Sequence, residues 1–134
     1  MIITEIAQYL HDNGLGIYSP NGVDGNIFLE FMPDEPDEAI CLHSTGGMAA
    51  DVATPITRPT VQVIVRGNTD SLAVAAIAES IHDALNNLHS MRFTLDGECI
   101  LLCQCRQSEP THIGVDENGR HEYSINLALI TGGN

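Results

Sequence analysis

Hydrophobic and polar residues alternate most clearly in the middle of the chain. In the segment 60–66 the three valines alternate with Thr, Gln, Ile and Arg, a period of two that predicts a strand. Apolar residues then recur at spacings of three and four, which predicts a long amphipathic helix. Its apolar stripe is Val74, Ile77, Ile81, Leu85 and Leu88. Thr69 or Asp70 is placed to act as its N-cap.

The N-terminal third carries shorter patterns. Residues 4–12 predict a short helix with Ile3, Ile6 and Leu10 on its inner side, ended by Gly14. Residues 26–32 and 39–43 predict two strands, the first with Ile27, Leu29 and Phe31 on one face. The acidic, proline-containing segment 33–38 between them indicates a turn, so we expect a hairpin. Residues 44–57 are rich in small side chains and predict a mobile loop.

The C-terminal third predicts three further strands. Asp96-Gly97 lies between two strand patterns, which is a strong signal for a two-residue hairpin turn. The polar segment 107–120 is either a β-extension or a long loop. The last segment alternates strictly, with Tyr123, Ile125, Leu127 and Leu129 on one face. The order helix, three strands, helix, three strands predicts one α+β domain over residues 1–134. It has a mostly antiparallel sheet of about five to six strands, packed by one long helix and a short N-terminal helix.

The charge balance narrows the range of partners. The formal net charge is −13, and all five basic residues are arginines. Such a surface repels nucleic acid and anionic membranes alike, so we expect neither partner. No apolar run approaches the roughly 20 residues that a membrane span needs. The N-terminus lacks the basic leader of a signal peptide, so synthesis in a cytoplasm is expected.

Two groups of residues are candidates for contacts between subunits. Arginine forms bidentate pairs, so Arg58 and Arg66 are candidates, although ion pairs within the chain explain them at least as well. Ala73, Ala76 and Ser80 form a small-residue flank of the long helix that would permit close approach of a neighbouring subunit. High helix propensity explains these alanines slightly better, without a partner.

The sequence offers little for catalysis or metal binding. No Cys-x-x-Cys, His-x-x-x-His or nucleophile-elbow spacing is present, so we expect no enzyme, no cofactor and no metal. Cys99, Cys103 and Cys105 share one strand parity with Leu101 and, like Cys41, are expected to be buried and reduced. Asp34, Glu35, Asp37 and Glu38 lack the spacing of a calcium loop and are typical of a solvated turn.

Two stretches carry a resemblance to a known family. The segment R-P-T-V-Q-V-I-V-R-G-N-T-D at 58–70 with the helix after it, and D-E-N-G-R-H-E-Y-S-I-N-L-A-L at 116–129, resemble the minor capsid proteins of long-tailed bacteriophages. That group is similar to the tail terminator proteins of the head–tail neck. The resemblance covers about the whole chain in the order of helices and strands, but the matching sequence motifs are confined to these two stretches.

The resemblance implies a structural virion protein at the tail or neck. Tail terminators cap the growing tail tube as a ring, usually of six subunits, and present the surface that joins the head. The implied partners are further copies of the chain, the tail tube protein and a head-completion or connector protein. Asp34, Glu35, Asp37 and Glu38 would then be candidates for the lumen or rim of the ring. The alternative from a different class is a monomeric acidic adaptor or inhibitor that binds a basic partner protein.

Overall fold

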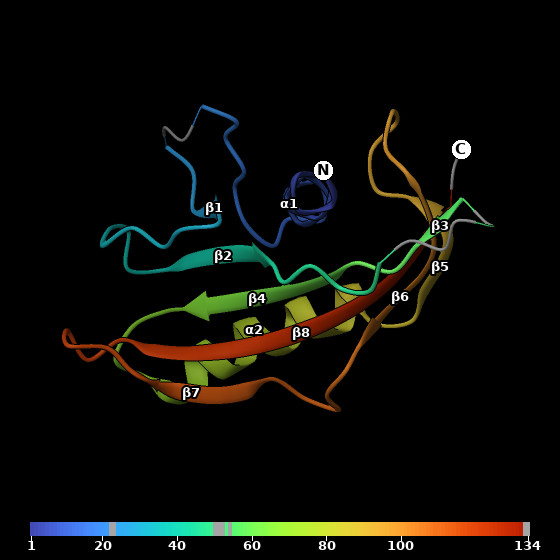
Figure 1. Ribbon diagram of the computed structural model, residues 1–134. Helices are drawn as coiled ribbons and strands as arrows, with labels where there is room; N and C mark the ends of the chain where they lie inside the picture. Colours follow the sequence, from blue (N-terminus) through green and yellow to red (C-terminus); the bar gives the residue numbers. More distant parts are fainter. Residues whose placement is uncertain (22–23, 50–52, 54, 133–134) are drawn as a thin grey trace.

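The computed structural model describes residues 1–21, 24–49, 53 and 55–132. Within them lie two helices and eight strands that form one sheet (Figure 1). The helices are α1 (Ile2–Asp12) and α2 (Ser71–Leu85). The strands are β1 (Ile27–Leu29), β2 (Ala39–Ser44), β3 (Ile56–Thr57), β4 (Thr60–Arg66), β5 (Leu88–Arg92), β6 (Cys99–Cys105), β7 (Thr111–Val115) and β8 (His121–Gly132).

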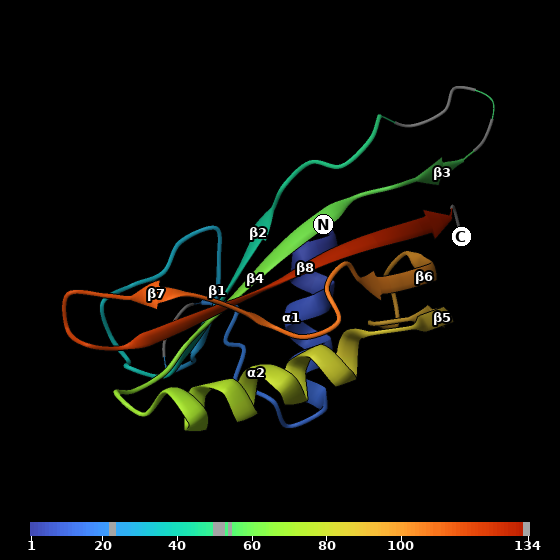
Figure 2. The same cartoon turned by 90° about the horizontal axis from the view of Figure 1, so that it is seen from below.

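Strand β8 organises the sheet. The strand order is β1-β2-β4-β8-β6-β5, and the 12-residue β8 is long enough to pair with two strands along each edge. One edge pairs with β4 and then β3, and the other pairs with β7 and then β6. These pairs are all antiparallel, so the expected α+β architecture with a mostly antiparallel sheet is confirmed. Figure 2 shows β4 and β8 running side by side through the molecule.

Both helices contribute to one hydrophobic cluster on the inner face of the sheet. Val61, Val63 and Val65 of β4 are at most 1% exposed, as the alternation predicts. Alternate residues of β8 are buried beside them, again as predicted: Tyr123, Ile125, Leu127 and Leu129. From the other side the cluster receives apolar residues of α1 and α2: Ile3, Ile6, Leu10, Val74, Ala78, Ile81 and Leu85.

The start of α2 agrees with its capping signal, whereas its end does not follow the predicted stripe. The Asp70 side chain accepts hydrogen bonds from the backbone N–H groups of Leu72 and Ala73, at 3.1 and 3.4 Å, and is therefore the N-cap. Helix α2 ends at Leu85, and Leu88 already belongs to β5. The Asn86 side chain accepts a hydrogen bond from the backbone N–H of Cys105, which ties the helix end to β6.

The predicted hairpin between the first two strands is wrong. Strand β1 pairs with β2 in parallel, with Ile27 opposite Ile40 and Leu29 opposite Leu42. Residues 30–38 therefore form a loop that returns the chain to the same end of the sheet instead of a tight turn. The predicted strand over 26–32 also shortens to three residues, and Phe31 is 63% exposed instead of facing the core.

The predicted two-residue turn at Asp96-Gly97 is wrong as well. Strands β5 and β6 do pair antiparallel, but residues 93–98 connect them and neither turn residue has a positive φ. Gly97 is required instead for close approach, because a Cβ there would lie 2.0 Å from Oε1 of Glu5. That carboxylate accepts a hydrogen bond of 2.8 Å from the backbone N–H of Glu98, so α1 is joined to this connection.

A register shift in β6 changes which cysteines face the core. The pairing with β8 shifts between Ile100 and Leu102, so residues before and after it do not share one alternation. Ile100, Cys103 and Cys105 face inward, whereas Leu101 is 39% exposed and Cys99 is half-buried. The predicted common face of Cys99, Leu101, Cys103 and Cys105 is therefore wrong.

Two strands exceed the five to six predicted. Strand β7 lies within the segment 107–120, so this segment is a β-extension and not simply a long loop. Strand β3 lies within the predicted mobile loop 44–57, and Met48 forms a bridge with Arg58. Gly47, with φ +83°, permits this approach, because a Cβ there would lie 2.1 Å from the carbonyl oxygen of Arg58. Residues 50–52 and 54 of that loop lie outside the described residues.

Candidate assembly surface

Two buried arginines shape the acidic loop, which we define as residues 33–38. Arg66, at the end of β4, is 4% exposed. Its guanidinium donates hydrogen bonds to three backbone carbonyl oxygens of the loop, those of Pro36 (2.6 Å), Asp37 (3.1 Å) and Asp34 (3.3 Å). Burial lowers the pKa of Arg66, and the nearby Arg120 guanidinium lowers it further. The side chain thus acts within the chain as a scaffold for the loop.

Arg120 holds the same loop from the start of β8. It is 6% exposed and forms ion pairs with Asp116 (2.8 Å), Asp34 (2.9 Å) and Asp37 (3.2 Å). It also donates to the backbone carbonyl of Asp34. Desolvation opposes the charge on Arg120, but the hydrogen bonds that its guanidinium donates to these carboxylates outweigh it and raise its pKa. Desolvation likewise acts to raise the pKa of Asp116, yet hydrogen bonds from Arg120 and Asn118 leave it below its usual range.

The acidic loop and the neighbouring segment line an open hollow of about 750 Å³, which we call the acidic hollow. Phe28 and Phe31 line it and contact each other edge to face, with ring centroids 6.5 Å apart. Glu35 and Glu38 line the same hollow and are exposed. Within the described residues neither carboxylate takes part in a side-chain hydrogen bond or ion pair, in contrast to Asp34 and Asp37.

A second concave surface lies on the outer face of the sheet, and we call it the arginine groove. Thr60, Ala128 and Gln104 lie side by side across β4, β8 and β6 and form its floor. Arg58 precedes Thr60 by two residues and Arg106 follows Gln104 by two, so strand alternation brings both arginines to this face. Its volume is about 430 Å³. Its apolar walls are Met48, Leu102 and Ile130.

The small-residue flank of α2 lies at the surface. Ala73 is half-buried, whereas Ala76 and Ser80 are exposed. The Ser80 hydroxyl donates to the carbonyl oxygen of Ala76 at 3.1 Å. Ser80 also lines a groove of about 330 Å³ together with Arg66 and Glu38. The nine predicted contact residues thus separate into the acidic loop with Arg66, the α2 flank beside it, and Arg58 in the arginine groove.

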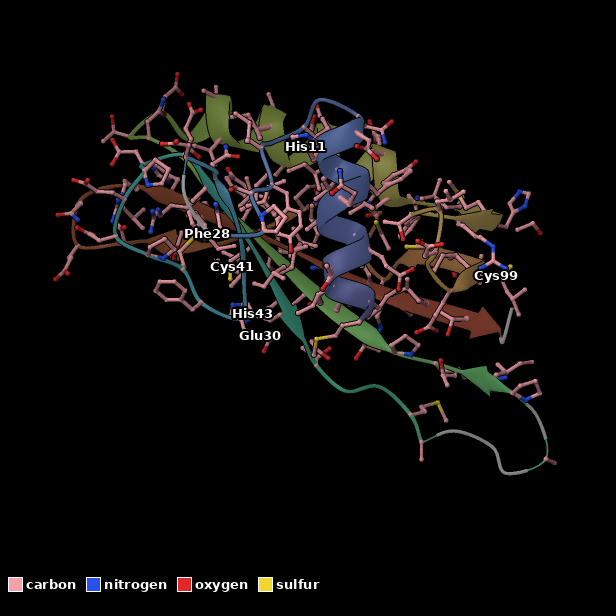
Figure 3. All side chains as sticks on the ribbon, turned by 90° about the horizontal axis from the view of Figure 1, so that it is seen from above. His11, Phe28, Glu30, Cys41, His43 and Cys99 are labelled. Atoms are coloured by element: carbon pink, nitrogen blue, oxygen red, sulfur yellow. The ribbon has the colours of Figure 1, made fainter. Side chains whose placement is uncertain are left out.

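A cysteine and a histidine lie side by side in β2. Cys41 lies 3.2 Å from Nε2 of His43 on the same strand, and Figure 3 shows both beside Glu30 and far from Cys99. Burial raises the pKa of the Cys41 thiol to about 11, so a thiolate does not form at neutral pH. Among the described residues no three His, Cys, Asp or Glu side chains gather as a metal site, and no helix there is long and apolar enough to cross a membrane.

Comparison with known proteins decides the family. A family model described as "Bacteriophage tail terminator protein" matches residues 9–131. The chain belongs to the bacteriophage tail terminator family. A chain of a solved virion of a native gene transfer agent particle shares the fold, with a TM-score of 0.64 at 12% sequence identity. That match covers 96% of this chain and 94% of that chain. No curated protein sequence matches this tail terminator.

Family membership assigns the protein a structural role in the phage virion, at the tail or neck. The resemblance inferred from 58–70 and 116–129 is confirmed, because both stretches lie within the matched residues. Sequence reasoning missed the roles of Arg106, Arg120 and Phe28. Arg120 directly follows the tight turn that begins at Asp116. Their closeness in sequence was the available signal that the guanidinium binds the Asp116 carboxylate.

Proposed function

We propose that this tail terminator caps the tail tube as a closed ring of six copies, stops tube polymerisation and presents the surface that joins the head. The observation that carries the proposal is the family match over residues 9–131. The partners are further copies of the chain, the tail tube protein and a head-completion or connector protein. The role is structural and involves no turnover.

The fold supports this role because it combines a stiff frame with projecting segments. A sheet covered by two helices resists bending, as a ring subunit must. The acidic loop, the segment around Met48 and the β5–β6 connection project from this frame, and each exposes a large apolar side chain at or beside it: Phe31, Met48 and Leu95. Exposed apolar side chains beside charged ones are typical of surfaces that become buried on assembly.

The charge supports the same proposal. A ring at the neck surrounds the path of the genome, and a chain with net charge −13 repels a polyanion instead of retaining it. In the proposed ring the acidic loop, with Asp34, Glu35, Asp37 and Glu38, lies at the rim, and the net charge of the six copies keeps the ring acidic as a whole. DNA then passes without binding.

Tube length tests the proposal. Purified tail tube protein is polymerised with and without the tail terminator, and tube lengths are measured by electron microscopy. We expect tubes to stop growing once one ring per tube end is supplied. An equally acidic unrelated protein is the control for charge alone. Unchanged tube lengths, with a terminator that stays monomeric, would contradict the proposal and favour the acidic adaptor.

A further inference from the structure

We propose that the arginine groove of one copy receives the acidic hollow of the next copy, and that this contact closes the ring. The inference rests on the proposed function and names the surfaces that the ring uses. It places Arg58 and Arg106 opposite Glu35 and Glu38. The apolar walls of the groove then cover Phe31.

Three of the five arginines bind groups of their own chain. Arg66 and Arg120 bind the acidic loop of their own chain, and Arg92 donates to the carbonyl oxygen of Gly97. Among the described residues, Arg58 and Arg106 are the two arginines without a side-chain hydrogen bond or ion pair. On a chain of net charge −13 without lysine, both unpaired cations therefore line one groove.

The groove has the chemistry of a protein contact. Met48 is 71% exposed, and Leu102 and Ile130 are half-buried, so burial of this wall removes apolar surface from water. Arginine beside exposed methionine is typical of interfaces between proteins, because the guanidinium pairs with carboxylates while its stem packs on apolar groups. A polyanion such as DNA is a poor occupant, because two cations on this chain cannot outweigh its net charge.

The acidic hollow is complementary to the groove in each of these respects. Glu35 and Glu38 are carboxylates without partners in the described residues. Phe31 lines the same hollow and is 63% exposed, next to Phe28. An unpaired acidic and aromatic surface thus faces solvent on the same chain as an unpaired basic and apolar one. Electrostatic complementarity of this kind fixes the register of a contact.

The two surfaces lie at opposite ends of β4. Thr60 begins the strand in the floor of the groove, and Arg66 ends it with a hydrogen bond to Pro36 of the acidic loop. Six steps along a strand span about 20 Å. Figures 1 and 2 agree that the loop between β1 and β2 lies at one end of the sheet and β3 at the other. A contact between unlike surfaces at opposite ends is head-to-tail, and such contacts generate rings when the rotation closes.

Charge reversal tests the contact. The groove variant carries Arg58→Glu and Arg106→Glu, and the hollow variant carries Glu35→Arg and Glu38→Arg. None of the four side chains is buried, so each variant is expected to fold, which circular dichroism verifies. Mass is measured by light scattering, alone and with tail tubes. We expect each variant alone to need at least ~10-fold more protein than the wild type for ring assembly.

The decisive measurement is ring assembly in a mixture of the two variants. In an equimolar mixture every groove meets a hollow of opposite charge, so alternating rings of three and three copies are expected to return. The chain with all four substitutions keeps the net charge of the wild type and is also expected to form rings. The hollow variant alone is less acidic than the wild type. If only repulsion between net charges mattered, this variant would assemble better than the wild type. The proposed contact instead predicts that its ring assembly is lost.

The outcomes separate the two proposals. If the wild type caps tubes and both variants do so equally well, the contact is wrong and the proposed function stands. The same holds if the groove variant forms rings in solution but loses binding to tubes. If the wild type neither assembles nor caps tubes, the proposed function and the contact both fail.

Discussion

At the scale of single residues, arginine carries most of the polar specificity of this protein. Arg66 binds three carbonyl oxygens through two guanidinium nitrogens, Nε and Nη2, a fixed planar geometry that a lysine ammonium does not have. Arg120 reaches three carboxylates, whereas Arg58 and Arg106, on the outer face, have no side-chain partner among the described residues. The same residue type therefore serves two purposes, one within the chain and one at its surface.

Replacing Arg66 by methionine tests its internal role. The methionine keeps an apolar stem, but the carbonyl oxygens of Asp34, Pro36 and Asp37 lose their donor. We expect the free energy of unfolding to fall by about 2 kcal/mol. Denaturant titration measures it, and Arg58→Met, at an exposed site, is the matched control with an expected change within about 0.5 kcal/mol. Loss of ring assembly with unchanged stability in Arg66→Met would instead make Arg66 a subunit contact.

Thiol reactivity tests the account of the cysteines. Burial raises the pKa of Cys103 to about 12 and that of Cys105 to about 11, as it does for Cys41. These thiols stay protonated and shielded at pH 8. A thiol-specific reagent is expected to modify one cysteine quickly, the half-buried Cys99, and the other three only on unfolding. Rapid modification of three or four thiols in the folded protein would contradict this burial.

At the scale of elements, periodicity and capping were readable from sequence, whereas contacts between distant segments were not. The alternation in β4 and β8 depends on near neighbours and was predicted correctly, and the cap is Asp70, one of the two neighbouring candidates. The loop that joins the parallel strands β1 and β2 is bound by Arg66 and Arg120, which lie far along the chain from it. The bulge in β6 shifts the alternation without any glycine or proline to signal it.

The candidate surface residues were likewise predictable only where the signal lies in the nearby sequence. The family resemblance made the acidic loop a candidate, and the bidentate chemistry of arginine made Arg58 and Arg66 candidates for contacts. Sequence could not separate Asp34 and Asp37, which pair with Arg120, from Glu35 and Glu38, because all four lie within one short turn. Arg106 had no local signal, since its place in the groove depends on the register of β6 against β8.

The junction between α1 and the β5–β6 connection gives a pH-dependent prediction. Burial raises the pKa of Glu5 above 4.5, although the hydrogen bond from the backbone N–H of Glu98 opposes the shift. The unfolded chain therefore loses this proton at lower pH than the folded chain, so stability falls as pH rises through 4.5 and the folded pKa.

Glu5→Gln removes this titration while its amide oxygen still accepts the bond from Glu98. We expect the variant to gain stability relative to the wild type as pH rises from 4 to 7, measured by thermal unfolding. Glu79→Gln, at an exposed position of α2, is the control and should track the wild type. A constant difference between wild type and Glu5→Gln across this range would contradict the raised pKa.

At the scale of the whole molecule, net charge opposes assembly while the local contact favours it. Six copies carry 6 × −13 = −78 formal charges. Salt screens this repulsion between exposed charges, whereas pairs that are desolvated in a contact are screened less.

We therefore expect rings to close at lower protein concentration as salt rises from about 0.1 M to about 1 M, over which the Debye length falls from about 10 Å to about 3 Å. Sedimentation across this series measures the effect. An equilibrium between monomer and ring that does not respond to salt would contradict the argument from charge.

The most direct test of the tail terminator account is the mass of the protein in solution with and without purified tail tubes, measured by light scattering at low and high salt. The account predicts a ring of six copies, either free or formed on the tube ends, and tubes that no longer elongate. A monomer at every salt concentration that ignores the tubes would contradict it.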